Sequence, residues 1–75
     1  MVEPKQVRAR IASVLNQSPE RVRDDVALSD LAVESLTLVE LAIDLQEDFH
    51  VRFGHEELAG VQTVGDLVAL VVGKR

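Results

Sequence analysis

Apolar residues recur at the spacing of an α-helix in three separate stretches of this 75-residue chain, and that periodicity constrains its fold more than any other feature. The first stretch predicts an amphipathic helix over residues 4–17, beginning at Pro4, a residue that suits a first helical turn. Its apolar face consists of Val7, Ile11, Val14 and Leu15. The dipeptide Ser18-Pro19 is expected to end the helix, because the residue before a proline disfavours helical backbone angles.

The second stretch runs from Ser35 to about His50, and its apolar residues fall on two stripes of the helical wheel. The stripe predicted to face the core consists of Leu38, Leu41, Ala42, Leu45 and Phe49. The other stripe, which lies beside Glu40 and Glu47, consists of Leu36, Val39 and Ile43. It is interpreted either as a contact with another helix or as an exposed docking surface, since apolar side chains bordered by carboxylates suit a transient interface with a basic partner.

The remaining segments predict a long loop, a short helix and a last helix. Residues 18–34 mix charged side chains with isolated apolar ones, which is typical of an ordered loop held against a core. Residues 55–59 allow one or two helical turns at most. Thr63 lies three residues before Asp66, an acidic variant of the capping box, and predicts a last amphipathic helix that continues to Gly73.

These elements predict an all-α fold, a small four-helix bundle of three longer helices and one short helix, with a long loop between helices 1 and 2. The chain is expected to form a single domain, 1–75, and to bury about 60% of the surface that it exposes when unfolded. A large enzyme pocket does not fit such a core. The hydrophobic fraction of 47%, supplied mainly by aliphatic residues, suits compact packing.

The net charge of −5 is unevenly distributed, because acidic residues dominate the segment 24–66, in which Arg52 is the one basic residue. An acidic surface repels the phosphates of nucleic acid and attracts basic patches on proteins, so nucleic acid is not an expected partner. No stretch approaches the roughly 18 apolar residues of a membrane-spanning helix, and the first residues lack an apolar signal core. A cytoplasmic protein without a membrane span is therefore expected.

The chain has no cysteine, so thiol chemistry would require an attached group. His50 and His55 lie five residues apart across a predicted helix end, which is not a typical ligand spacing, and no metal site is expected. Both are interpreted as surface groups, too far along the chain from Ser35 to activate its hydroxyl. Four arginines are interpreted as separate solvated charges and not as a basic patch: Arg8, Arg10, Arg21 and Arg23.

A family resemblance is carried by the segment Leu31-Ala32-Val33-Glu34-Ser35-Leu36-Thr37-Leu38-Val39-Glu40-Leu41, which is similar to the acyl carrier protein family. The family's usual run is Leu-Gly-x-Asp-Ser-Leu, followed by Val-Glu-Leu on an amphipathic helix. The chain matches it at Leu31, Ser35, Leu36, Val39, Glu40 and Leu41. It departs from the pattern at Ala32, where glycine is usual, and at Glu34, where aspartate is usual.

The resemblance implies that a phosphopantetheinyl transferase moves 4′-phosphopantetheine from coenzyme A to Ser35, and that the terminal thiol of this arm carries acyl groups as thioesters. Ser35 is then a substrate, and the chain is not an enzyme. A phosphodiester there would lie at a helix N-terminus, where free N–H groups stabilise an anion by about 0.3–1 kcal/mol.

The resemblance also implies partners, namely acyl-loading, condensing and tailoring enzymes of a fatty-acid, polyketide or specialised lipid pathway. Their basic patches would meet a surface formed by Glu34, Leu36, Val39, Glu40, Ile43 and Glu47. The chain is expected to act as a monomer.

Two alternative functions share these features. A peptidyl or aryl carrier of a nonribosomal pathway has the same bundle, but it usually carries Gly-His or a similar pair before Ser-Leu, so Glu34 favours an acyl carrier. An unmodified acidic adaptor would bind a protein through the same stripe and leave Ser35 bare. An isolated serine at the start of a helix most often serves only as a cap for a free backbone N–H.

Overall fold

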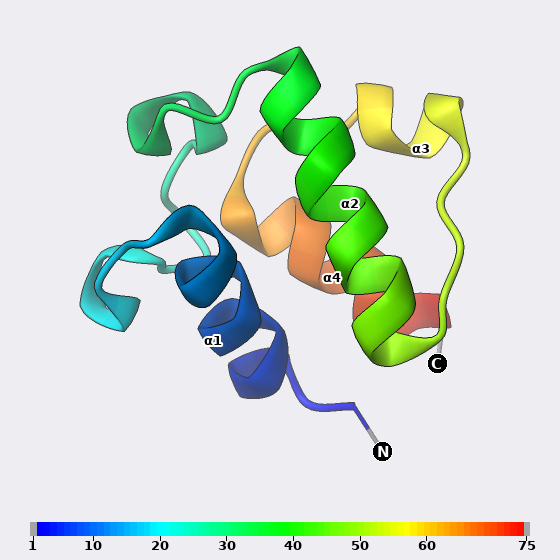
Figure 1. The fold of residues 1–75 in the computed structure, drawn as a ribbon, viewed down its shortest axis with the longest axis horizontal. Helices are drawn as coiled ribbons and strands as arrows, with labels where there is room; N and C mark the ends of the chain where they lie inside the picture. Colours follow the sequence, from blue (N-terminus) through cyan, green and yellow to red (C-terminus); the bar gives the residue numbers. More distant parts are fainter. Residues whose placement is uncertain (1, 75) are drawn as a thin grey trace.

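The computed structural model describes residues 2–74, which form four α-helices and no strand. The helices are α1 (Pro4–Leu15), α2 (Ser35–Phe49), α3 (His55–Ala59) and α4 (Val64–Lys74). Two short 3₁₀ helices, η1 (Pro19–Arg21) and η2 (Leu28–Leu31), interrupt the connection between α1 and α2. The predicted all-α bundle of three longer helices and one short helix is confirmed. Figure 1 shows α3 beside the N-terminal half of α2, with α4 behind α2.

The first helix ends two residues earlier than the predicted range 4–17. Asn16 adopts a left-handed backbone conformation with φ 56°, and the N–H of Gln17 donates to the carbonyl of Ala12 at 2.9 Å. Asparagine tolerates this conformation better than most residues, so it closes the helix before the proline at position 19 is reached.

The core lies where α1 packs against both α2 and α4. Its fully buried side chains are Val7, Ile11, Val22, Leu41, Leu45, Val64, Leu67 and Val71. The core stripe predicted for α2 is confirmed, because Leu41, Ala42 and Leu45 are buried and both Leu38 and Phe49 are partly buried against the same cluster. Each fully buried Val, Leu or Ile side chain contributes about 1.5–3 kcal/mol to folding.

The long loop is ordered because backbone hydrogen bonds tie it to the start of α4. The N–H of Leu28 donates to Gln62, the N–H of Val64 donates to Val26, and the N–H of Gly65 donates to Asp24, each at 2.9 Å. Buried apolar side chains of the loop, Val22, Leu28, Leu31 and Val33, add packing to these bonds. The segment that precedes α2 is therefore held in place from the opposite end of the chain.

The start of α4 confirms the predicted capping box. The N–H of Asp66 donates to Thr63 Oγ1 at 3.1 Å, and the N–H of Thr63 donates to Asp66 Oδ2 at 3.1 Å. The N–H of Gln62 also donates to Asp66 Oδ2, at 3.0 Å. These backbone donors, Gln62 and then Thr63, hold the pKa of Asp66 below its ordinary value.

The interpretation of all four arginines as separate solvated charges was wrong for Arg8 and Arg10, while the ion pair of Arg23 with Asp25, at 3.9 Å, stays largely exposed on both side chains. Arg8 forms an ion pair with Asp24 at 3.1 Å, and Arg10 forms one with Asp48. These pairs join α1 to the long loop and to α2. Each is partly exposed, and such pairs contribute roughly 0–1 kcal/mol.

Candidate functional site

Ser35 is exposed and is the first residue within α2. The cap position belongs to Glu34, whose extended backbone precedes the helix and whose carbonyl accepts the N–H of Leu38 at 2.7 Å. Within the described residues, no side chain caps this end of α2. The hydroxyl of Ser35 is thus not placed as a helix cap, and the first N–H groups of α2 lack a side-chain acceptor.

The turn before α2 delivers Ser35 to the surface. Leu31 and Val33 point into the core on either side of Ala32, which adopts a left-handed conformation with φ 60°. The N–H of Val33 donates to the carbonyl of Leu28 at 3.0 Å and fixes this turn. Left-handed backbone costs a residue with a Cβ atom about 1–2 kcal/mol, which explains why glycine suits the position.

A shallow hollow of about 220 Å³ opens beside Ser35, between α2 and α3. Its lining consists of Ser35, Leu38, Val39, His55, Leu58 and Ala59. A further hollow of about 180 Å³ is lined by Val39, Ala42, Ile43, Gln46, Phe53, His55 and Leu58. Because three residues line both, the two hollows adjoin, and we call them together the α2–α3 groove. The groove is mostly apolar, and Ser35 lines one of its two hollows.

His55 lines this groove together with Ser35. The two residues are twenty positions apart in the sequence, and the sequence alone therefore did not predict that they share a hollow. The side chain is exposed at the first position of α3. No side-chain hydrogen bond joins His55 to Ser35 in the part of the chain that the structure describes. His50 lies at the other end of α2, where it is the C-cap. Among residues 2–74, no cluster of metal-ligating side chains forms.

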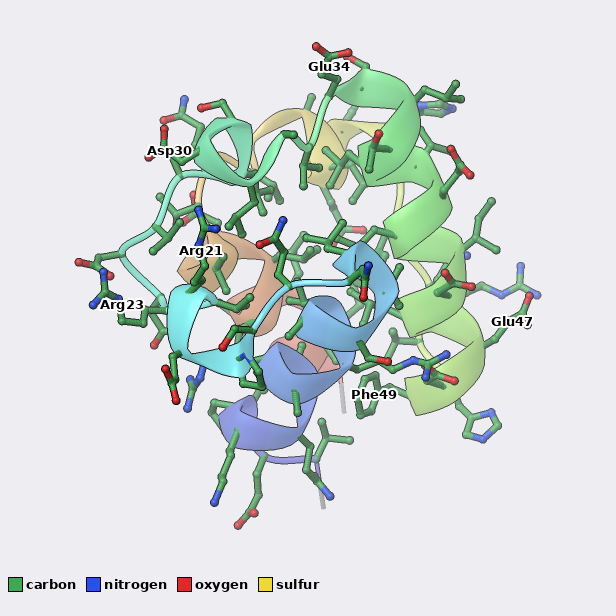
Figure 2. All side chains as sticks on the ribbon, turned by 60° about the vertical axis from the view of Figure 1, so that its left-hand side comes forward. Arg21, Arg23, Asp30, Glu34, Glu47 and Phe49 are labelled. Carbon is green, nitrogen blue, oxygen red and sulfur yellow. The ribbon has the colours of Figure 1, made fainter. Side chains whose placement is uncertain are left out.

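The second stripe of α2 is exposed and does not pack into the bundle. The exposed fractions are 73% for Leu36, 42% for Val39 and 47% for Ile43. The carboxylates of Glu34, Glu40 and Glu47 are exposed as well. We call this set of six residues the docking face, and Figure 2 shows Glu34 and Glu47 near its two ends.

Basic side chains of the long loop lie away from the docking face. Figure 2 shows Arg21 and Arg23 on the loop side of the molecule, well separated from Glu47. The nearest acidic group to the Arg23 guanidinium is Asp25, at 3.9 Å. The surface around Ser35 therefore combines exposed apolar side chains with carboxylates, a combination that favours a partner with a basic surface.

Comparison with known proteins identifies the family. The sequence model described as "Phosphopantetheine attachment site" matches residues 5–71. The acyl carrier protein of Wolinella succinogenes is 33% identical over 66 residues, a match that covers 87% of each chain. The meromycolate extension acyl carrier protein of Mycobacterium tuberculosis is 31% identical over a match that covers 93% of this chain, which spans only 65% of the length of that relative.

The fold is also found in a solved structure. The crystal structure of an acyl carrier protein from Thermotoga maritima superposes with a TM-score of 0.83 and covers 95% of this chain and 88% of that one, at 20% sequence identity. The family's cofactor is 4′-phosphopantetheine, attached covalently. The site fits this cofactor, because the exposed Ser35 does not serve as a helix cap and lies at the N-terminus of α2 beside an apolar groove. The chain belongs to the acyl carrier protein family of phosphopantetheine-binding proteins.

Proposed function

We propose that the protein is an acyl carrier whose Ser35 bears the 4′-phosphopantetheine arm and whose docking face presents the arm to partner enzymes. The observation that carries the proposal is the position of Ser35. Its side chain is exposed at the first residue of α2, free of a capping role, and lines the mouth of the α2–α3 groove. This is the same serine that the family motif singles out.

Attachment is a phosphoryl transfer. The hydroxyl oxygen of Ser35 attacks the pyrophosphate of coenzyme A, the new phosphodiester forms, and adenosine 3′,5′-bisphosphate leaves. The transferase supplies the base that takes the hydroxyl proton, because Ser35 and His55 are not hydrogen-bonded and no acid orients the imidazole among the described residues. The chain is thus proposed to act as a substrate and carrier and not as an enzyme.

The arm supplies the thiol that this cysteine-free chain lacks, and acyl groups are carried on it as thioesters. The α2–α3 groove offers apolar contacts to the arm and to the first carbons of a cargo, through Val39, Ile43 and Leu58. Tethering keeps the thioester at a high effective concentration near each active site that the protein visits.

The proposed partners are a phosphopantetheinyl transferase and enzymes that load, condense and tailor acyl chains in a fatty-acid, polyketide or specialised lipid pathway. Exposed Leu36, Val39 and Ile43 supply short-range contact, while Glu34, Glu40 and Glu47 steer basic patches toward the face. The names of the mycobacterial relatives favour a lipid pathway.

Residues 1–75 are proposed to form one carrier domain, and the protein is proposed to act as a monomer in the cytoplasm, where a transferase finds coenzyme A. The family match to residues 5–71 supports the single domain. In the part of the chain that the structure describes, no helix has the length and apolar character to cross a bilayer. Light scattering at several concentrations tests the monomer.

The experiment that tests the carrier function is intact mass after incubation with coenzyme A and a broad-specificity phosphopantetheinyl transferase. The wild type is expected to gain one phosphopantetheine, and Ser35→Ala is expected to gain none. Ser29→Ala is the matched control, because Ser29 is also exposed and lies in η2, just before the site. A wild type that gains no mass with several transferases would favour the unmodified adaptor.

A further inference from the structure

The charge of the α2–α3 groove depends on one side chain. Of all the residues that line its two hollows, His55 is the only one with an ionisable side chain. The others are apolar apart from Ser35 and Gln46. An imidazole can carry a positive charge and donate N–H hydrogen bonds, so His55 is the one lining side chain able to offer both to an anion.

The charged groups on the surrounding elements do not line the groove. They are Glu34, Glu40, Asp44, Glu47 and Asp48 at or on α2, Arg52 in the connection to α3, Glu56 and Glu57 on α3, and Lys74 at the end of α4. Glu57 lies two residues after His55 on α3. Its carboxylate accepts hydrogen bonds from Lys74 Nζ at 2.8 Å and from the N–H of Gly54 at 2.9 Å. These contacts hold the Glu57 carboxylate in an ion pair with Lys74.

A phosphodiester on Ser35 would enter this setting as a monoanion. On one side it meets the carboxylate of Glu34, which precedes it in the chain and repels it. On the other side lies the hollow that Ser35 shares with His55. From that side a protonated imidazole would offer the phosphate an N–H donor and a positive charge.

We propose that His55 binds the phosphodiester of the arm on Ser35 and so positions the first part of the arm along the α2–α3 groove. The inference rests on the proposed attachment at Ser35 and assigns a positioning residue to it. When His55 is protonated, the phosphate is held against α3 and the arm starts in the groove beside Val39 and Leu58. When His55 is neutral, the charge contact is lost and the arm is free to extend toward a partner.

The chain's other histidine offers a control for this proposal, because it lies far from Ser35 along α2. His50 is the C-cap of α2, a helix of 15 residues, whereas Ser35 is the first residue of that helix. At 1.5 Å per residue, the two ends of α2 are about 20 Å apart, beyond a Debye length at physiological salt. Charge on His50 is therefore screened from a phosphate on Ser35.

The test follows the ³¹P resonance of the phosphodiester in the holo-protein from about pH 5 to 8, the range in which imidazoles titrate. A phosphodiester does not itself titrate in that range. The resonance is expected to move with pH in the wild type and in His50→Gln, and this movement is expected to disappear in His55→Gln. His55→Lys keeps a cation over the whole range, so its resonance should stay near the acidic wild-type position at every pH.

Circular dichroism melts of all variants check that the fold is retained, and intact mass first checks that Ser35 carries the arm. A wild-type resonance that does not move, an equal movement in His55→Gln, or loss of the movement in His50→Gln would overturn the role of His55 and leave the carrier function intact. A protein that gains no mass would overturn both.

Discussion

The backbone carbonyl oxygen of Asp24 lies 2.9 Å from the point that a Cβ atom on Gly65 would occupy. The same oxygen accepts the N–H of Gly65 at 2.9 Å, so the backbones of the long loop and of the first turn of α4 are in direct contact. Only a residue without a side chain permits this contact. The loop that carries the chain toward Ser35 is thus anchored through a glycine thirty positions downstream.

Gly65→Ala is expected to destabilise the protein, although alanine is the better helix former. The new methyl group would press on backbone atoms that cannot rotate away, and overpacking of this kind costs roughly 1–3 kcal/mol. Gly73→Ala is the matched control, because a Cβ there meets nothing within 4 Å and should stabilise α4 by up to about 1 kcal/mol. Urea unfolding measures both changes, and equal behaviour of the two variants would contradict the close approach.

Ala32→Gly is expected to stabilise the protein by about 0.5–1 kcal/mol. Relief of left-handed strain at φ 60° contributes about 1–2 kcal/mol, and the greater freedom of glycine in the unfolded chain removes part of that gain. Ala69→Gly, at an exposed position within α4, should instead destabilise by about 1 kcal/mol. Thermal melts decide the matter, and a loss of stability in both variants would rule out strain at Ala32.

Much of the fold was predictable because each helix carries its own periodic signal. The core stripe of α2 and the cap formed by Thr63 and Asp66 both follow from local spacing, and both are present. The end of α1 was misplaced, because Asn16 carries a weaker breaking signal than the proline three residues later. The pairing of the long loop with α4 was missed as well, since hydrogen bonds between distant backbones leave little trace in side-chain patterns.

The candidate site was only partly predictable for the same reason. Ser35 and the exposed stripe lie on one helix, so a wheel and a motif find them. The approach of His55 to Ser35 depends on how α3 packs beside α2, and no spacing along the chain encodes it.

Ile43→Glu and Glu40→Lys are expected to weaken partner docking and leave the melting temperature nearly unchanged. Ile43 is 47% exposed and Glu40 is exposed, so neither supports the core. Loss of one apolar contact or reversal of one charge should raise the KM of a phosphopantetheinyl transferase by about tenfold, equivalent to about 1.4 kcal/mol. Glu20→Lys makes the same charge change in η1 and should leave KM unchanged. Unfolding of either docking variant would show that the stripe belongs to the core.

Leu41→Ala is expected to destabilise the domain by roughly 2–5 kcal/mol, because its side chain is fully buried between the helices. Phe49→Ala should also destabilise the domain. The loss should be smaller than for the same substitution at a fully buried phenylalanine, since the ring of Phe49 is only partly buried. The free energy of unfolding in urea gives both values. An unchanged midpoint for Leu41→Ala would contradict the core assignment.

Acid is expected to destabilise the protein partly through Asp66. Backbone hydrogen bonds from Gln62 and Thr63 lower the pKa of Asp66 from its ordinary value of 3.8, so the unfolded chain binds its proton more readily than the folded one. Its contribution is therefore complete above about pH 4–5 and is lost as the pH falls through the folded-state value. Asp66→Asn keeps an accepting oxygen but cannot ionise, so the loss of stability between pH 5 and 3, measured by urea midpoints, should be shallower than in the wild type. Asp30→Asn, which removes the same charge at an exposed position in η2, is the control. If stability falls between pH 5 and 3 as steeply in Asp66→Asn as in Asp30→Asn, the cap is not a source of the pH dependence.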